Sequence, residues 1–550
     1  MIKALLHSLL SPVAPPYDAL EWEQRPFPER CRLACQSWAL QGYGSPLSIV
    51  FAYALKVALL FCAWLGFCAL SPSLGPASDL GRWWLLPLAF QKAILWAMCF
   101  ESLGLGCGSG PLTGRYLPPV GGFLYFLRPG TTRHPLVGKG HLRTWLDVGL
   151  YAALQLSLLR ALVAPALEAS YFWPVVVLLP LLGLRDKTIF LAARSEHYLT
   201  TVACFLFAGN WIAGAKAVQL ALWFWAGVSK LNHHFPAVVG VMMSNSPTMR
   251  FAFFRRWMYR SYPDDLRPSR LATWMAHAGT ALELSVPVVL GLASGGEATL
   301  IGMVMMLALH GFITSSVPMG VPIEWNVMVV YGAFFLFFAN ASVSVFSVGA
   351  PMLVVLAVML VVVPLVGNFF PRFVSFLLAM RYYAGNWACS VWLFRGDSRK
   401  KLGRLTTSAP WPMEQLLRLY DGRTAVGLLG KVVAFRTMHL HGKALQLLLP
   451  KAVDRVDDYE WADGELIAGL VLGWNFGEGH LHDERLLRAV QAQCGFEEGE
   501  LRCVFLESQP LFKGELAWRI ADAKSGERAR GTVRVDELRA LQAWPAEGPR

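Results

Sequence analysis

The sequence predicts a mainly α-helical, polytopic membrane bundle of about eight to ten spans, followed by a small C-terminal α+β cytosolic domain. Of the 550 residues, 55% are hydrophobic and only 16% are charged, and the mean hydropathy is +0.43. A soluble chain of this size would carry about a quarter charged residues. Runs of about 20 apolar residues, long enough to cross a bilayer, recur through the first two-thirds of the chain. Beyond about residue 400 these runs stop and charged residues become frequent.

Residues 1–46 are mixed in character. Pro12 and Pro15 interrupt a short apolar stretch, and Asp18 follows at once. A secretory signal needs a charged start, a long apolar region and a small-residue cleavage site, which are not assembled here. We therefore expect a cytosolic or interfacial segment, with the first span beginning near Leu47.

Residues 47–375 contain the predicted transmembrane bundle. Its apolar runs lie at 47–70, 84–107, 144–166, 172–185, 197–231, 272–294, 299–318, 324–346 and 350–370. The run at 172–185 is short for a span unless it is tilted or extended. Gly209 and Gly214 interrupt the run at 197–231, which fits either one long tilted helix or two half-spans that break near these glycines. The connection 108–143 is unusually long, and we expect it to fold over the membrane surface as part of a site.

Basic residues predict the orientation of the bundle. They gather before the first span and within 115–143, 250–270 and 395–404. Because cytoplasmic loops carry an excess of Lys and Arg, these four segments and both termini are expected in the cytoplasm, with an even number of crossings. The net charge of +12 is therefore ascribed to topology and to attraction to anionic membrane lipids, and not to nucleic acid.

The remaining chain is divided into an interfacial linker at 376–402 and a soluble cytosolic domain at 403–550. Residues 413–449 have a helical pattern. Residues 502–507 and 517–522 alternate apolar and polar side chains, which predicts strands. The domain is therefore expected to be of the α+β type.

Lys230 carries the strongest functional signal. It ends an apolar run, in Ala226-Gly-Val-Ser-Lys230-Leu-Asn232. An ammonium in or beside hydrocarbon is costly unless it is paired, hydrated or neutral, and a lysine that sheds its proton becomes a base or a nucleophile. A lysine at a helix end can equally extend to the headgroups, so a structural role stays open. Lys216 would lie near the same face of one continuous helix, about 21 Å away.

Ionisable residues in later spans are candidates to act with Lys230. Glu283 is its natural counter-ion and His310 is a candidate proton relay, although a lone histidine in a helix often serves only as a hydrogen bonder. The candidates for holding or orienting a bound molecule are Trp225, Ser229, Asn232 and His277.

Three other charged residues have ordinary explanations. Lys92 and Glu101 share one apolar run and can pair within their helix or with neighbours. Glu324 stands at a helix start, where the helix dipole favours a carboxylate.

Two H-x-H pairs in the C-terminal domain are weak metal candidates. They are His439 with His441, and His480 with His482. On a strand, both members of such a pair point to the same face and could bind a metal. Hydrogen bonding at the surface, or helix capping by Asp483, explains them as well, so no metal site is predicted.

The frame around Lys230 resembles the motif that ends a span in the vitamin K-dependent γ-carboxylase superfamily, the horizontally transferred transmembrane domain. In that family the lysine is the active-site base, and Lys230 falls on it. Leu309-His310-Gly-Phe-Ile-Thr-Ser-Ser316 resembles a later element, and the similarity covers about residues 190–345. The carboxylase's large lumenal region has no recognisable counterpart here. The resemblance therefore extends to a quinol-fed oxidation or deprotonation step, and not to protein carboxylation.

Over nearly its whole length the chain also resembles a family of bacterial multi-pass membrane proteins of unknown function. The stretches that carry this resemblance lie at 121–130, 184–190, 265–270, 323–326, 383–387 and 473–484. It implies a place in the bacterial inner membrane and imports no activity.

Together these patterns predict an integral inner-membrane enzyme whose activity is uncharacterised. Its cavity is expected between the runs at 197–231, 272–294 and 299–318, where apolar walls would suit a reduced isoprenoid quinone or another lipid-soluble small molecule. Neutral Lys230 would be the base, with Glu283 tuning its proton affinity. The alternative is a non-enzymatic protein for lipid binding, transport or maturation, in which the same residues line a passage or hold the bundle together.

Overall fold

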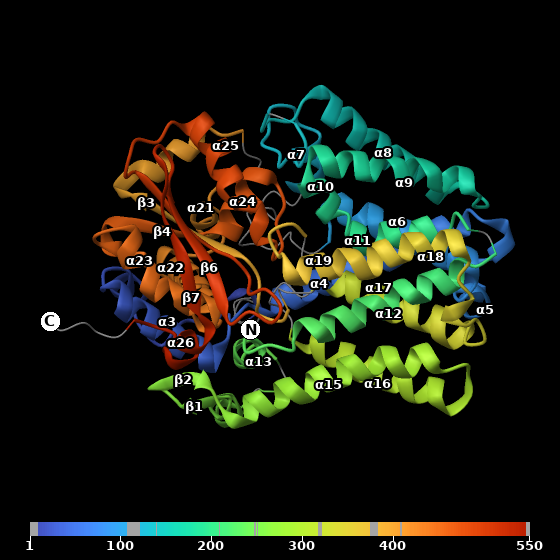
Figure 1. The fold of residues 1–550 in the computed structure, drawn as a ribbon, viewed down its shortest axis with the longest axis horizontal. Coiled ribbons are helices and arrows are strands. Elements are labelled where there is room, and N and C mark those ends of the chain that lie inside the picture. The colour runs from blue at the N-terminus through green and yellow to red at the C-terminus, as the bar shows by residue number, and fades with distance from the viewer. Residues whose placement is uncertain are drawn as a thin grey trace.

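A computed structural model of the chain describes residues 9–106, 121–374, 383–406 and 410–545, apart from 139, 208, 247, 248, 250 and 317–321. A helical bundle and a sheet-containing domain lie end to end (Figure 1). The N-terminal helices α2 (Ala19–Glu23) and α3 (Phe27–Gln41) lie beside the sheet-containing domain. The predicted fold class, a mainly α polytopic protein with a small C-terminal sheet, is confirmed.

Apart from the short α5 (Leu80–Trp83), whose segment is bent from α6 (Pro87–Ser102) by 108°, the helices of the bundle have roughly parallel axes (Figure 1). They are α4 (Leu47–Ala69), α5 (Leu80–Trp83), α6 (Pro87–Ser102), α8 (Trp145–Val163), α9 (Ala169–Arg185), α11 (Ser195–Cys204), α12 (Trp211–Ser229), α15 (Arg270–Leu292), α16 (Gly296–Ser315), α17 (Ile323–Ala333) with η5 (Phe334–Ala339), and α18 (Ala350–Ala357) with η7 (Val358–Val362) and α19 (Val363–Phe369). Short helical turns η1 (Pro72–Leu74), η2 (Ala77–Asp79) and η6 (Val345–Ser347) lie in the connections.

Five helices in the described part of the chain are long and apolar enough to cross a membrane, and a bent pair would make six. The five are α4, α8, α15, α16 and Ala350–Phe369, and the bent pair is Ala77–Trp83 with Pro87–Ser102. The helices Ala169–Arg185 and Ile323–Ala339 are apolar but shorter. The chain is therefore a membrane-embedded protein, while the count of about eight to ten spans stays a prediction.

The glycine-interrupted run at 197–231 forms two helices, α11 and α12. The chain turns between Phe205 and Asn210, where the Asn210 N–H donates to the carbonyl oxygen of Phe207 at 3.1 Å. The rings of Phe205 and Trp211 pack edge to face across the turn, with centroids 5.0 Å apart. The alternative of two helices that break near the glycines is confirmed.

The domain contains a five-stranded antiparallel sheet in the order β4-β3-β5-β6-β7. Its strands are β3 (Cys389–Arg395), β4 (Tyr459–Asp463), β5 (Leu501–Leu506), β6 (Glu515–Asp522) and β7 (Gly526–Arg534). Its helices are η8 (Gly396–Arg404), α21 (Pro412–Leu416), α22 (Gly422–Met438), η9 (His441–Ala444), α23 (Leu445–Ala452), η10 (Val456–Asp458), α24 (Gly464–Leu472), η11 (Gly479–Leu481), α25 (Glu484–Cys494) and α26 (Val535–Ala540). The two strands predicted at 502–507 and 517–522 match β5 and β6.

The sheet begins earlier than predicted. Strand β3 lies inside 376–402, the segment expected to be a linker, and pairs with β4 on one side and β5 on the other. Its apolar residues Val391–Phe394 are fully buried. Burial on both faces, and not a surface path, explains this apolar run.

The N-terminal helices α2 and α3 lie on the same side of the bundle as the C-terminal domain (Figure 1). Helix α3 packs on α22, and Arg30 of α3 forms an ion pair with Asp457 at 2.8 Å. The Trp38 indole donates to the carbonyl oxygen of Val241 at 2.9 Å. The described part of residues 1–46, the segment expected to be cytosolic or interfacial, is packed on the C-terminal domain.

Short elements connect the bundle to this domain. They are α7 (Gly121–Phe126), α10 (Lys187–Ala192), α13 (Phe235–Met243), α14 (Ala252–Trp257), β1 (Tyr259–Ser261) and β2 (Asp265–Pro268). Buried residues of both parts, among them Phe126 and Trp325 of the bundle and Trp474 and Phe476 of the domain, belong to one continuous apolar core.

Candidate functional site

The first candidate site is the ion pair between Lys230 and Glu283. Lys230 caps the end of α12, and its Nζ donates to Glu283 Oε2 on α15. The two side chains are only 8% and 5% exposed, and the ammonium lies 5.2 Å from the centroid of the Phe235 ring. A side chain at Gly227, one turn earlier, would meet Leu284 at 2.6 Å, so the glycine allows α12 and α15 to approach closely here. The structure thus provides the counter-ion that the sequence predicts.

This pairing restricts the chemistry of Lys230. An amine in an ion pair holds its proton and has no lone pair with which to accept another. It could act as a base only after the proton had passed to Glu283 or to another group. The catalytic role of Lys230 therefore stays a prediction.

His310 forms hydrogen bonds through both ring nitrogens. The Trp223 indole donates to Nε2 at 2.9 Å, and Nδ1 lies 2.8 Å from Asn326 Oδ1. Because an indole can only donate, Nε2 accepts, and the ring hydrogen is assigned to Nδ1. The imidazole joins α12, α16 and α17, and it could relay a proton only by giving up one of these bonds.

Two of the predicted orienting residues are used within the protein. The Trp225 indole donates to the carbonyl oxygen of Leu360 at 2.7 Å. The Ser229 hydroxyl donates to the carbonyl oxygen of Ala226 at 2.9 Å. Both bonds hold α12 in place.

The other two predicted orienting residues lie apart from one another. Asn232 Oδ1 accepts from the N–H of His234 at 2.7 Å and so shapes the turn before α13. His277 is exposed on α15, about 120° around the helix from Glu283. The structure does not bring His277 to the Lys230 pair.

The two lysines of α12 serve opposite ends of the helix. Lys216 Nζ donates to the carbonyl oxygens of Asn340 and Val343, at 2.9 and 2.6 Å. These carbonyls lie in the connection after η5, at the end of the bundle away from the sheet (Figure 1). Lys216 is therefore not part of the Lys230 site.

A second group of buried ionisable residues, the junction cluster, lies where the bundle meets the C-terminal domain. Its members are Lys56, Glu101, Arg194, Glu196, Tyr198 and Glu324. Arg194 Nε contacts Glu101 Oε1 at 2.8 Å, and Lys56 Nζ contacts Glu324 Oε1 at 2.7 Å. The Arg194, Glu101 and Glu324 side chains are at most 2% exposed. Four helices, α4, α6, α11 and α17, thus bring their charges together.

Arg194 has a strained backbone. Its φ and ψ are 48° and 49°, a left-handed conformation that a non-glycine residue adopts at a cost. Its guanidinium lies 5.6 Å from the ring of Trp325 and 5.6 Å from that of Phe476 in the C-terminal domain. Such strain at a buried charge is typical of functional positions.

The sequence patterns did not indicate most of this cluster. Glu101 was expected to pair with Lys92 or with neighbours, and the structure gives it Arg194, while Lys92 Nζ donates to the carbonyl oxygen of Phe67 at 2.6 Å. Glu324 was explained as a helix-start carboxylate. Lys56 could have been found, because it is a charged residue inside the apolar run at 47–70.

An apolar cavity of about 360 Å³ lies beside the junction cluster, between α4, α5, α6 and α17. Its walls include Leu60, Trp64, Ala93, Trp96, Met328 and Tyr331. Lys56 directly precedes the lining residue Val57, and Glu324 lies three residues, about 4.5 Å along the helix, before the lining residue Val327. The cavity expected from the sequence lay instead between α12, α15 and α16.

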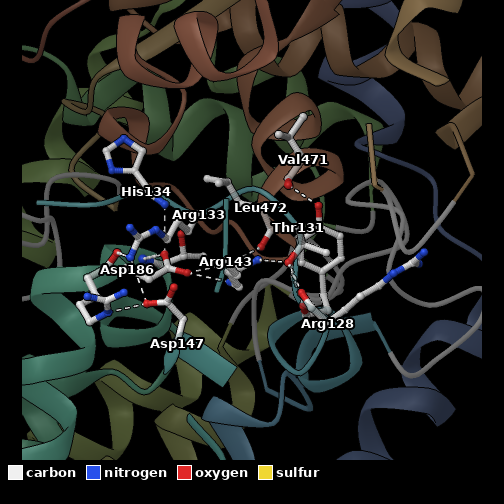
Figure 2. A network of polar contacts seen from close by, with 12 residues as sticks. Arg128, Thr131, Arg133, His134, Arg143, Asp147, Asp186, Val471 and Leu472 are labelled. Carbon is white, nitrogen blue, oxygen red and sulfur yellow. Dashed lines mark hydrogen bonds and ion pairs between the residues drawn. The ribbon is translucent and has the colours of Figure 1, made fainter. Parts of the chain in front are cut away.

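A network of polar contacts joins the bundle to the domain (Figure 2). Arg143, which is 2% exposed, donates through Nε to Asp186 Oδ2 at 2.9 Å and through Nη1 to Thr131 Oγ1 at 3.0 Å. Its Nη2 reaches the carbonyl oxygen of Leu472, at the end of α24, at 3.3 Å. The described part of the long loop at 108–143 therefore lies at this junction, and residues 108–120 lie outside the described residues.

Asp147 forms the second half of the network (Figure 2). It accepts from Arg133 at 3.0 Å and from Arg185 at 2.6 Å. The same carboxylate accepts from the N–H of Thr144 at 2.7 Å, as part of a capping box that starts α8.

His480 lies between two carboxylates at the same junction. Its Nδ1 is 3.0 Å from Glu478 and its Nε2 is 2.8 Å from Glu507. Lys187 of α10 contacts the same Glu478 at 3.1 Å. Burial acts to lower the pKa of His480, but the two carboxylates outweigh it and raise this pKa to about 9. The imidazole is therefore a charged link between domain and bundle.

The other H-x-H histidines are buried hydrogen bonders. His482 Nδ1 lies 2.7 Å from the Ser390 hydroxyl, and His439 Nδ1 lies 2.6 Å from the carbonyl oxygen of Phe435. His441 Nδ1 lies 3.0 Å from the carbonyl oxygen of Gly385. Within the described ranges, no three His, Cys, Asp or Glu side chains are grouped so that they could hold a metal.

Comparison with known proteins identifies a family for nearly the whole chain. No curated protein and no solved structure matches it. A family model described as a transmembrane protein of unknown function (DUF3556) matches residues 8–550. The chain therefore belongs to this family of transmembrane proteins.

Proposed function

We propose that this transmembrane protein binds a lipid-soluble small molecule inside its bundle, with a reduced isoprenoid quinone as the first candidate. The observation that carries the proposal is the apolar cavity of about 360 Å³ that borders the ion pair between the partly buried Lys56 and the buried Glu324. Apolar walls with a few polar groups at one end are the usual form of a small-molecule site.

The surroundings of the cavity favour entry from the bilayer. Phe61 and Gly81, which line the cavity, are exposed. Only 11% of the residues in the most apolar 18-residue part of α4 are buried inside the protein. A hydrophobic ligand could therefore reach the cavity sideways from the hydrocarbon, which a water-soluble ligand could not.

The test is the lipid content of the purified full-length protein. We expect mass spectrometry of extracted lipids to find a quinone or another single-headed isoprenoid at about one per protein. Ala93→Leu, which reduces the cavity, should lower this occupancy. Ala278→Leu is the matched control, because Ala278 is exposed on α15. Bulk phospholipid alone in the unaltered protein would contradict the proposal.

A second candidate function is an enzyme that removes a proton from the bound molecule, and the buried Lys230–Glu283 pair favours it. Glu283 would take the proton of Lys230, and the neutral amine would then deprotonate a quinol hydroxyl. Oxidation of a short-chain quinol by dioxygen, followed by absorbance, tests this step. We expect Lys230→Met and Glu283→Gln to abolish it and the exposed His277→Gln to retain it. Equal rates in all three proteins would exclude the enzyme.

A further inference from the structure

The two ion pairs of the junction cluster are already balanced in charge. Arg194 is paired with Glu101 and Lys56 with Glu324, which adds up to zero. Glu196, in the first turn of α11, is 5% exposed and adds another acidic group. Further negative charge in this cluster would therefore be repelled and not attracted.

The cluster nevertheless contains polar atoms without a hydrogen bond. Tyr198 is fully buried, and its hydroxyl has no partner among the described residues. The same holds for Glu101 Oε2. The Tyr198 N–H donates to the carbonyl oxygen of Arg194 at 3.0 Å, so Tyr198 lies one helical turn from the Arg194–Glu101 pair. A hydroxyl can donate or accept, whereas a carboxylate oxygen only accepts. Buried groups of this kind normally have a partner.

The charged residues Lys56, Glu101 and Glu324 of the cluster lie towards one end of the apolar cavity. Glu101 follows the lining residue Trp96 on α6 by five residues, about 7.5 Å along the helix. Lys56 and Glu324 adjoin the lining residues of α4 and α17. A molecule with its tail in the cavity would therefore place its head at the cluster.

We propose that the junction cluster binds the polar head of this molecule, and that the head is uncharged and carries a hydroxyl group. This inference rests on the proposed binding function. A hydroxyl would donate to Glu101 Oε2 and accept from the Tyr198 hydroxyl, which satisfies both atoms. A phosphate head would instead face the carboxylates of Glu101, Glu196 and Glu324, and it would compete with Glu101 for Arg194 and with Glu324 for Lys56.

The test compares two probes that share one tail. The full-length protein is placed in phosphatidylcholine nanodiscs and titrated with farnesol or farnesyl monophosphate. Trp64 and Trp96 line the cavity, so their fluorescence reports occupancy. We expect farnesol to bind at least about tenfold more tightly than the phosphate.

Variants of the cluster should change this preference in defined ways. Glu101→Gln leaves Arg194 without its counter-charge. The affinity for farnesyl monophosphate should therefore rise, and the roughly tenfold preference for farnesol should become smaller or reverse. Tyr198→Phe removes a single oxygen and should weaken farnesol by about fivefold. Glu297→Gln is the matched control, because Glu297 is exposed in the first turn of α16, and it should leave both affinities unchanged.

The outcomes separate the two proposals. If neither probe binds, the cavity does not hold an apolar tail, and the proposed function is overturned together with this inference. If the phosphate binds as tightly as the alcohol, or if Tyr198→Phe leaves farnesol unaffected, only the assignment of the head group is overturned.

Discussion

When one member of a buried ion pair is removed, the other member keeps its charge in a place that offers neither water nor a counter-charge. At His480, two carboxylates share one imidazole, and Lys187 shares one of these carboxylates. The four groups come from the bundle and from separated segments of the domain. The protonation of this one side chain therefore influences how firmly the two parts are joined.

The junction should be sensitive to alkaline pH. Since the folded-state pKa of His480 is raised from 6.5 to about 9, its stabilisation is complete below pH 6.5 and is lost as the pH rises through 9. The pKa of Glu507 is lowered, so this carboxylate affects stability only at acidic pH. Its contribution to the stability of the folded protein is lost as the pH falls below the ordinary carboxyl range. We expect the Tm of the purified protein to fall between pH 6.5 and 9.

His480→Gln tests this assignment. It should cost about 2 kcal/mol at pH 6 and should flatten the dependence of Tm on pH above 6.5. His277→Gln, an exposed change of the same kind, should keep the slope of the unaltered protein. An unchanged slope in His480→Gln would show that another group titrates.

How far the sequence reveals single residues depends on where their partners lie. Glu283 was predicted as the partner of Lys230 because a charge inside an apolar run needs a counter-charge in the same bundle. His480 was read with His482 as an H-x-H pair, whereas its partners include Glu507 and, through Glu478, Lys187. The local pattern contains no information about such distant contacts.

At the scale of elements, composition predicted helices well and boundaries less well. The break between α11 and α12 follows from the glycine and asparagine at 209–210. Strand β3 was missed, because a short apolar run next to a membrane span fits a linker equally well. Only its pairing with β4 and β5, which come much later in the chain, makes it a strand.

The close contact between η11 and the residue before β3 requires a glycine at position 479. A Cβ at Gly479 would lie 1.8 Å from the carbonyl oxygen of Ala388, just before β3. Backbone atoms cannot rotate away as side chains do, so Gly479→Ala should cost about 3 kcal/mol or more. The measurement is the Tm in detergent, together with the yield of folded protein. Gly403→Ala, where a Cβ meets no atom within 4 Å, is the control, and equal losses in both would refute the argument.

At the scale of the whole molecule, basic residues from the predicted loop clusters lie at the end of the bundle that meets the C-terminal domain. Arg143 reaches α24 and Arg267 donates to the carbonyl oxygen of Ala540 at 3.1 Å. Arg255 donates to the carbonyl oxygen of Leu40 in the N-terminal segment. The clusters that the sequence assigned to one side of the membrane thus meet the two ends of the chain. The distribution of Lys and Arg in the sequence predicts that these clusters share one side of the bundle. It does not predict the contacts by which the C-terminal domain packs on that side.

This arrangement predicts the orientation of the protein when it is produced in a bacterial host and inserted in the inner membrane. By the positive-inside rule, the sheet-containing domain and both termini should lie in the cytoplasm. The connection between α15 and α16, at 293–295, lies at the opposite end of the bundle (Figure 1) and should face the periplasm. A fluorescent protein fused to the C-terminus should therefore fluoresce in a bacterial host, and alkaline phosphatase fused there should be inactive. Fusions that end at Gly295 should give the reverse result. Active phosphatase at the C-terminus would show that the orientation is the opposite of the predicted one, with the junction cluster on the periplasmic side.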